Sequence, residues 1–269
     1  MSQDNQSLTR GMKIIEFLSD HPNGCALVDI ADGVGLNKST AYRLIKSLVT
    51  LNYVTSASGT GCYRLTSKFI AIGNKTHAAL DIIPIAQPYL KDLNARTGDA
   101  VKLSAREKYL SVLIFHLEPT EGMFRTHAYV GQGHKLHFSG MGKCYLAFSP
   151  KGFLEKYWEE EREHIVSCTP NTITNIEVMR HELARIREER ISYDREENEI
   201  GISCVASPII NVNNKVDHAI SITVPSSRFT AKTSMEIGLK VRETADAISR
   251  EMGWTGENAP KTQRRAITH

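Results

Sequence analysis

Residues 27–44 constrain the fold of this chain more than any other segment, because they fit two short helices joined by a tight turn. Ala31 is small enough to let two helices approach closely, and Gly35 can adopt the positive φ that the turn requires. Apolar residues at helical spacing are expected to fill the core between the helices, and these are Ile30, Val34, Leu36, Ala41 and Leu44. The combination predicts a helix-turn-helix, a motif whose second helix enters the major groove of DNA. A helical hairpin without this function needs only some of these residues together.

The second helix of the motif is expected to begin after Asn37, whose side chain can cap its first turn. The outward-facing residues that we expect to contact DNA are Lys38, Ser39, Thr40, Tyr42, Arg43 and Lys46. Residues near the N-terminus of such a helix reach base edges, so Ser39, Thr40 and Arg43 are candidates for base contacts. Lys38 and Lys46 are expected to bind phosphates.

The segments on either side predict a winged version of this motif. Helical spacing predicts a helix over Leu8–Ser19, with Ser7 as its N-cap. Residues 53–65 favour a β-hairpin with a polar tip at Ser58–Gly61, which is the expected wing. Arg64, at the base of this wing, is expected to contact the DNA backbone or the minor groove.

The charge distribution agrees with a DNA-binding role for this part of the chain. The formal net charge of +3 is small, but residues 33–80 contain no Asp or Glu. The same stretch holds six cationic side chains, Lys38, Arg43, Lys46, Arg64, Lys68 and Lys75. Such a stretch creates a local positive potential that favours a polyanion, although a solvated face can also lack acidic residues by chance.

A chain of 269 residues is long enough for two domains, each with its own core. Helical spacing continues from Ser67 to Asn94 with interruptions at Pro84 and Pro88, which predicts a linker helix, a kink and the first helix of a second domain. The expected boundaries are 1–75 for the DNA-binding domain, 76–94 for the linker helix region, 95–256 for a second, larger domain and 257–269 for a flexible basic tail.

Beyond residue 100 the chain alternates between strand and helix patterns. The expected strands cover 101–105, 110–117, 201–210 and 218–224, and the expected helices cover 142–147, 152–163, 177–189 and 231–252. Hairpins mixed with helices predict an α+β domain that is built on an antiparallel sheet.

Several stretches together resemble one known family. Leu8–Gly73 resembles the DNA-binding domain of the isocitrate-lyase-regulator (IclR) family of bacterial transcription regulators, a winged helix-turn-helix. Leu136–Lys143 and Tyr193–Ala206 are similar to signature stretches of the family's effector-binding domain, which is GAF-like. The resemblance implies that residues 95–256 form this effector-binding and oligomerisation domain. The resemblance covers nearly the whole chain. It implies a repressor of a carbohydrate or sugar-acid catabolic operon, which binds a pseudo-palindromic operator in double-stranded DNA as a homodimer or homotetramer.

The resemblance also implies where a small-molecule effector binds. The expected effector-binding residues are Gly140, Met141, Asp194, Cys204, Ser221 and Thr223, and in family members these positions contact small carboxylates. Threonine at position 223 stands where serine is commoner in the family. Backbone N–H groups at Ser139–Lys143 can bind an anion, and an ionised Asp194 accepts hydrogen bonds, which suits a sugar acid with hydroxyl groups. A solvated acidic turn at residues 194–197 is the alternative for this segment.

Two other classes of function remain open from the residues alone. An enzyme that acts on a carboxylate, with an accessory DNA-binding domain, would use Cys204, but no His or acidic partner is identifiable by spacing. A regulator that senses metal or redox state would use its cysteines together with His134, His137 and His127, but no third metal ligand is fixed by the sequence. We therefore expect no catalytic residue, no metal site and no cofactor.

Composition, with 41% hydrophobic and 23% charged residues, is that of a soluble globular protein. No apolar run approaches the roughly 20 residues that span a bilayer, and the N-terminus lacks the order of a signal peptide. We therefore expect a cytoplasmic protein with no membrane partner. The five cysteines are dispersed without a C-x-x-C pair, which argues against structural disulfides and a zinc ribbon.

Overall fold

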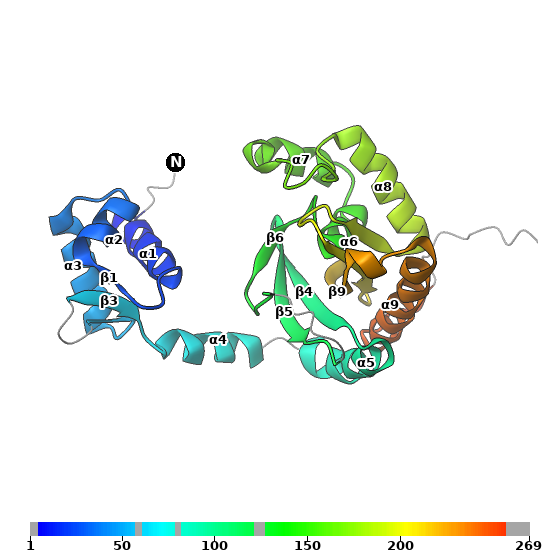
Figure 1. Cartoon of the computed structure of the whole chain (residues 1–269), viewed down its shortest axis with the longest axis horizontal. Coiled ribbons are helices and arrows are strands. Elements are labelled where there is room, and N and C mark those ends of the chain that lie inside the picture. The colour runs from blue at the N-terminus through cyan, green and yellow to red at the C-terminus, as the bar shows by residue number, and fades with distance from the viewer. Residues whose placement is uncertain (1–4, 57–60, 79–81, 121–126, 257–269) are drawn as a thin grey trace, which may run out of the picture. The chain divides into compact units, whose positions relative to one another are not determined.

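The computed structural model of the chain describes residues 5–56, 61–78, 82–120 and 127–256. It divides the chain into two compact units, Met1–Leu80 and Asp81–His269. Figure 1 labels most elements of each unit. Within the described residues, no helix is both long and apolar enough to cross a membrane.

The first unit is a small helical domain with a three-stranded antiparallel sheet in the order β1-β3-β2. Its elements are α1 (Gln6–Ser19), β1 (Cys25–Ala26), α2 (Leu27–Gly33), α3 (Lys38–Thr50), β2 (Val54–Ser56), β3 (Cys62–Leu65) and α4 (Lys68–Ala78). One buried cluster joins α1, α2, α3 and the sheet, and it contains Ile14, Leu18, Cys25, Ile30, Ile45 and Val54. Burial of these side chains holds the helices in place, since short helices in isolation are marginal in water.

The predicted helix-turn-helix is confirmed in α2 and α3. Gly35 has a φ of +66°, and Ala31 is buried where the two helices meet. Asn37 caps α3, because its side-chain oxygen accepts a hydrogen bond from the Thr40 N–H at 2.8 Å. The expected cap at Ser7 is wrong, because Asn5 accepts the hydrogen bond from the Leu8 N–H and α1 begins one residue before Ser7.

The expected wing is present as the antiparallel pair β2 and β3, in which Thr55 lies opposite Arg64. Cys25 and Ala26 add a third short strand to this hairpin, which the sequence pattern did not predict. The predicted polar tip lies outside the described residues, except for Gly61.

The predicted interruption of the helical pattern by proline is wrong for Pro88. Helix α5 (Ile82–Thr97) contains Pro84 in its first turn and continues through Pro88. A proline in the first turn removes no hydrogen bond, and burial of Ala86 and Leu90 on either side of Pro88 offsets the one donor that it lacks.

The second unit is built on one six-stranded antiparallel sheet in the order β6-β5-β4-β9-β8-β7. Its strands are β4 (Ala100–Glu107), β5 (Leu110–Leu117), β6 (Gly133–Lys135), β7 (Ser192–Arg195), β8 (Ile202–Ile210) and β9 (Val216–Pro225). The predicted α+β fold with an antiparallel sheet is therefore confirmed. The two edge strands, β6 and β7, were not predicted, because each is only three or four residues long.

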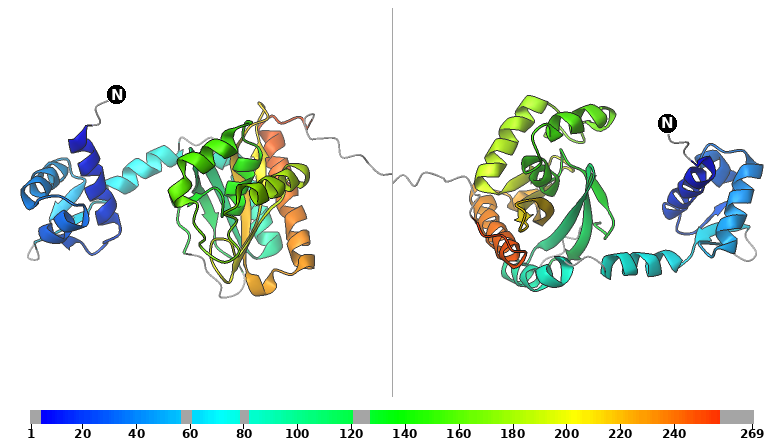
Figure 2. Two further views of the ribbon diagram at one scale, coloured as in Figure 1. Left: turned by 90° about the horizontal axis from the view of Figure 1, so that it is seen from above. Right: turned by 180° about the vertical axis from the view of Figure 1, so that it is seen from behind.

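Helices cover both faces of this curved sheet (Figures 1 and 2). Besides α5, the helices of this unit are α6 (Gly140–Ala147), α7 (Phe153–Glu160), α8 (Ile176–Glu189) and α9 (Ala231–Glu251). Helix α6 packs inside the curve against β8 and β9, whereas α5 and α9 cover the outer face. Side chains alternate between the faces, so that Ala206 meets α6 at Gly140 and its neighbour Val205 packs with Ile237 of α9.

Candidate DNA-binding surface and effector cavity

Helix α3 presents a polar surface on the side opposite the core. Ala41 and Ile45 are fully buried, whereas Tyr42, Arg43 and Lys46 on the other faces are exposed. This division follows from the 3.6-residue period of the helix.

The first turn of α3 carries the remaining candidates for DNA contact. Lys38 and Ser39 are exposed, and Thr40 is half-buried. The Ser39 hydroxyl donates to the Asn37 side chain at 2.8 Å, so its proton supports the cap and its oxygen remains free to accept. Ser39 can therefore accept a hydrogen bond from a base but cannot donate one without weakening the cap.

The cations of this surface have no acidic partner in the described part of the first unit. Within that part, no ion pair involves Lys38, Arg43 or Lys46. Arg64 is exposed on β3, next to the hairpin. Lys68 differs, because its ammonium donates to the Leu51 carbonyl at 2.7 Å and lies 4.0 Å from the centre of the Tyr53 ring. Lys68 thus fixes α4 to the domain, whereas the other four cations remain available to phosphates.

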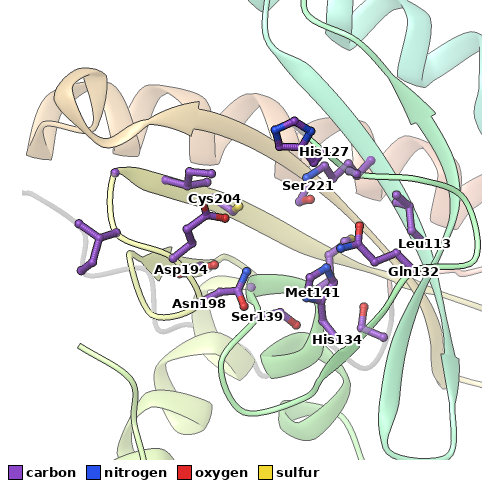
Figure 3. Close-up of a pocket in the computed structure, with 18 residues that line it drawn as sticks. Leu113, His127, Gln132, His134, Ser139, Met141, Asp194, Asn198, Cys204 and Ser221 are labelled. Carbon is purple, nitrogen blue, oxygen red and sulfur yellow. The ribbon is translucent and has the colours of Figure 1, made fainter. Parts of the chain in front are cut away.

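The second unit contains a cavity of about 410 Å³ between the sheet and the start of α6 (Figure 3). It is lined by Lys102, Ser111, Leu113, His127, Ala128, Gln132, His134, Ser139, Gly140, Met141, Asp194, Asn198, Glu199, Ile200, Gly201, Ile202, Cys204 and Ser221. Five of the six predicted effector-binding residues line this cavity, and Thr223 does not. A volume of this size suits a small organic molecule.

The N-terminus of α6 forms one wall of the cavity. Ser139 caps the helix by accepting a hydrogen bond from the Gly142 N–H at 3.0 Å. A Cβ at position 142 would lie 2.5 Å from the backbone of Leu136, so only glycine fits there. The N–H groups of Gly140 and Met141 belong to the first helical turn, where the helix itself offers no acceptor. They are therefore suited to an anionic or carbonyl oxygen from a ligand.

Asp194 is buried in the cavity wall with only 4% of its surface exposed. It lies on strand β7, and its Oδ1 accepts a hydrogen bond from the Glu197 N–H at 2.7 Å. Burial, followed by the charge of Glu197, raises the pKa of Asp194 to about 7. The alternative of a solvated acidic turn is therefore wrong, since the segment passes into the protein at both Asp194 and Glu197.

A buried ion pair lies behind this segment. Lys143, on α6, is completely buried and forms a hydrogen-bonded ion pair with Glu197, while Glu182 of α8 lies 3.8 Å from the same ammonium. The pair joins the first turns of α6 to the chain just after Asp194, which fixes the position of the Asp194 carboxyl group. No local sequence pattern predicted this ion pair, because Lys143, Glu182 and Glu197 come from different segments of the sequence.

Cys204 and Ser221 occupy the cavity wall on strands β8 and β9. Burial, followed by the charge of Asp194, raises the pKa of the Cys204 thiol to about 11, so it stays protonated at neutral pH. Thr223 is buried beside it, and its hydroxyl lies 3.4 Å from the Cys204 sulfur. Thr223 thus contacts a residue that lines the cavity, without lining the cavity itself.

The histidines considered as metal ligands separate in the structure. His127 and His134 line the cavity, whereas His137 is buried away from it and its Nδ1 lies 2.8 Å from the Tyr157 hydroxyl. Among the residues described, no three His, Cys, Asp or Glu side chains come together as a metal site would require.

Comparisons with known proteins identify the family. Residues 7–58 match the model of the IclR helix-turn-helix domain, and residues 74–250 match that of the bacterial transcriptional regulator IclR C-terminal domain. The chain belongs to the IclR family. It is a transcriptional regulator with a DNA-binding domain, and the family models and relatives that it matches are regulators rather than enzymes.

Individual IclR proteins agree with this assignment over most of the chain. The DNA-binding transcriptional repressor YiaJ of Escherichia coli K12 is 47% identical over 251 residues, which cover 93% of this chain and 89% of YiaJ. The crystal structure of the Thermotoga maritima IclR is 30% identical and superposes with a TM-score of 0.73, covering 93% of this chain and 99% of that one. An IclR homologue from Microbacterium hydrocarbonoxydans, crystallised with 4-hydroxybenzoate, is 21% identical with a TM-score of 0.76, covering 92% and 99% of the two chains.

One side of the IclR cavity was not anticipated from the sequence. Lys102 of β4, Ser111 and Leu113 of β5, and Gln132 and His134 line it opposite Asp194 and Cys204. Figure 3 shows Leu113 and Gln132 on the side away from Asp194. The only available signal was the alternation of residues along β4 and β5, which shows that residues share a face but not which face meets a cavity.

Proposed function

We propose that this protein represses an operon for the breakdown of a carbohydrate or sugar acid, and that a small carboxylate releases it from its operator. The observation that carries the proposal is the cavity in the second unit, where first-turn N–H groups of α6 and the buried Asp194 face the same space. The N–H groups suit a carboxylate oxygen, and the Asp194 carboxyl group suits a hydroxyl. A ligand with both groups is a hydroxy acid.

The comparisons support both halves of the proposal. A 47% identical relative is a DNA-binding transcriptional repressor, and another protein of the same fold has been crystallised with the small carboxylate 4-hydroxybenzoate. Residues 37–40, 64–71 and 194–198 resemble those of the family's repressor of diketo-L-gulonate utilisation, which points to sugar acids as the class of effector. In the proposed mechanism a homodimer or homotetramer places two α3 helices on a pseudo-palindromic operator, and the effector favours an arrangement that no longer matches both half-sites.

Fluorescence anisotropy on DNA from upstream of the protein's own gene tests this proposal. We expect binding that is tight, sensitive to salt and stronger than on random DNA, and that D-gluconate, 2-keto-L-gulonate or a related sugar acid weakens it. The Asp194→Asn variant is expected to bind the same DNA but to respond less to the acid. Binding that no sugar acid or keto acid weakens would contradict the proposed effector class, and equal affinity for random DNA would contradict the proposed operator.

A further inference from the structure

We propose that Lys102 is the anionic-group anchor of the effector cavity and makes it select acids over the corresponding uncharged sugars and alditols. This inference rests on the proposed function, because it assigns a residue and a ligand charge to the same cavity. It adds a recognition residue on β4 that was not among the predicted effector-binding residues.

The sheet register places Lys102 beside Ser221. The two residues are direct partners across β4 and β9, so their side chains lie on the same face with Cβ atoms about 5 Å apart. Ser221 is 2% exposed and lines the cavity, as Lys102 does. An ammonium and a hydroxyl side by side can bind the two oxygens of one carboxylate.

Lys102 has no counter-ion in the described part of the protein. Within that part, no carboxylate lies within ion-pair distance of its ammonium, and no hydrogen bond of the side chain is found. Arg106, four residues further along β4, is by contrast paired with Asp217 at 3.7 Å and hydrogen-bonded to Ser149 at 2.9 Å. A bound anion would give this half-buried ammonium the partner that the described side chains do not supply.

The acidic residues of the cavity lie elsewhere and cannot replace this anion. Asp194 belongs to β7, three strands away from β4 in the sheet, which corresponds to about 14 Å between the strands. His134, nearer to Lys102, does not add a second charge, because burial first and the Lys102 charge second lower its pKa. The cavity is thus asymmetric in charge, with a cation at β4 and an acid at β7.

This asymmetry in charge determines how the ligand is oriented and to which chemical class it belongs. Its carboxylate contacts Lys102, Ser221 and the first-turn N–H groups of α6, and its hydroxyl groups extend towards Asp194. An alditol of the same length could make the hydroxyl contacts but would leave the ammonium unpaired. Sites that lose a charged hydrogen bond in this way reject the uncharged analogue.

Calorimetric titration of the full-length protein with D-gluconate and 2-keto-L-gulonate, and with the uncharged D-glucitol, tests the inference. Lys102→Met removes the charge and keeps the length of the side chain, Lys102→Gln is a second neutral variant, and Lys102→Arg restores the charge. Lys215→Met is the matched control, since Lys215 is an exposed lysine in the turn between β8 and β9. Circular dichroism checks that each variant folds.

We expect the acid that binds best to lose about 10- to 100-fold in affinity in both neutral variants, and to regain most of it in Lys102→Arg. Lys215→Met should bind it as the unmodified protein does, and D-glucitol should bind weakly to all variants. Undiminished acid affinity in the folded neutral variants, or D-glucitol binding as tightly as the acids, would overturn the role of Lys102 and leave the proposed function intact. If neither acid binds the unmodified protein, both the Lys102 anchor and the sugar-acid effector are wrong.

Discussion

Arg43 and Lys46 are exposed cations three residues apart on α3, and their chemistry separates their expected roles. The guanidinium of Arg43 can donate two parallel hydrogen bonds to a guanine edge, whereas the Lys46 ammonium acts as a point charge on a phosphate. We expect Arg43→Ala to reduce discrimination between operator and random DNA by about 1–3 kcal/mol. Lys46→Ala should weaken binding to both DNAs alike and reduce the salt slope by about one. Anisotropy titrations at several salt concentrations measure both quantities.

An Arg43→Ala protein with unchanged affinity and unchanged discrimination would show that α3 does not dock through this face. Lys68→Ala is a useful comparison, since Lys68 caps a carbonyl inside the domain. Its substitution should lower the melting temperature without a specific loss of discrimination.

Asp194 predicts a pH dependence of stability with a definite sign. Its pKa in the folded protein, about 7, lies above its ordinary value of 3.8, so the folded state holds a proton that the unfolded state has released between these pH values. The stability that this proton contributes is present below about pH 4 and is lost as the pH rises to about 7. The free energy of unfolding of the unmodified protein, minus that of Asp194→Asn, should therefore fall by roughly a few kcal/mol as the pH rises through this window. Urea unfolding at a series of pH values measures the difference, and parallel curves would rule out a buried, protonated Asp194.

At the scale of elements, the N-terminus of α6 has no room for a side chain at Gly142. A methyl group at Gly142 would lie 2.5 Å from the Leu136 backbone and 2.6 Å from the capping Ser139 hydroxyl. We expect Gly142→Ala to lower the free energy of unfolding by about 1–3 kcal/mol and to weaken effector binding, because the cap and the first turn must move.

Gly11→Ala provides the control for this substitution, because Gly11 also lies in a helix but has no atom within 4 Å of the added methyl group. It should stabilise α1 by up to about 1 kcal/mol through helix propensity. Thermal unfolding of both variants distinguishes the two cases, and equal effects would mean that α6 has more room than the backbone geometry allows.

At the scale of the whole molecule, the two proposed functions, DNA binding and effector binding, belong to separate units. All residues of the effector cavity lie in Asp81–His269, and all candidate DNA contacts lie in Met1–Leu80. We expect a fragment of residues 81–269 to bind the effector as tightly as the full chain and to show no preference for operator DNA. Calorimetry and anisotropy measure the two properties. Loss of effector affinity in a folded fragment would show that the DNA-binding unit contributes to the cavity.

Much of this molecule was determined by the sequence alone. The helix-turn-helix, the Asn37 cap, the Gly35 turn and most strands of the sheet follow from patterns among residues close together in the chain. Periodicity and capping act over three or four residues, so a single sequence contains them in full. The family resemblance added the effector residues, of which Thr223 alone lies outside the cavity lining.

The tertiary structure decided which polar residues are buried and which of them meet. The sequence left a solvated acidic turn at residues 194–197 open as an alternative, and the pairing of β7 with β8 and of Lys143 on α6 with Glu197 excludes it. In the sequence, Lys102 is only a lysine within an expected strand. The pairing of β4 with β9 places it beside Ser221 in the cavity wall. Burial and charge pairing depend on contacts between segments far apart in the chain, and the energy of a charged group depends on those contacts rather than on its sequence neighbours.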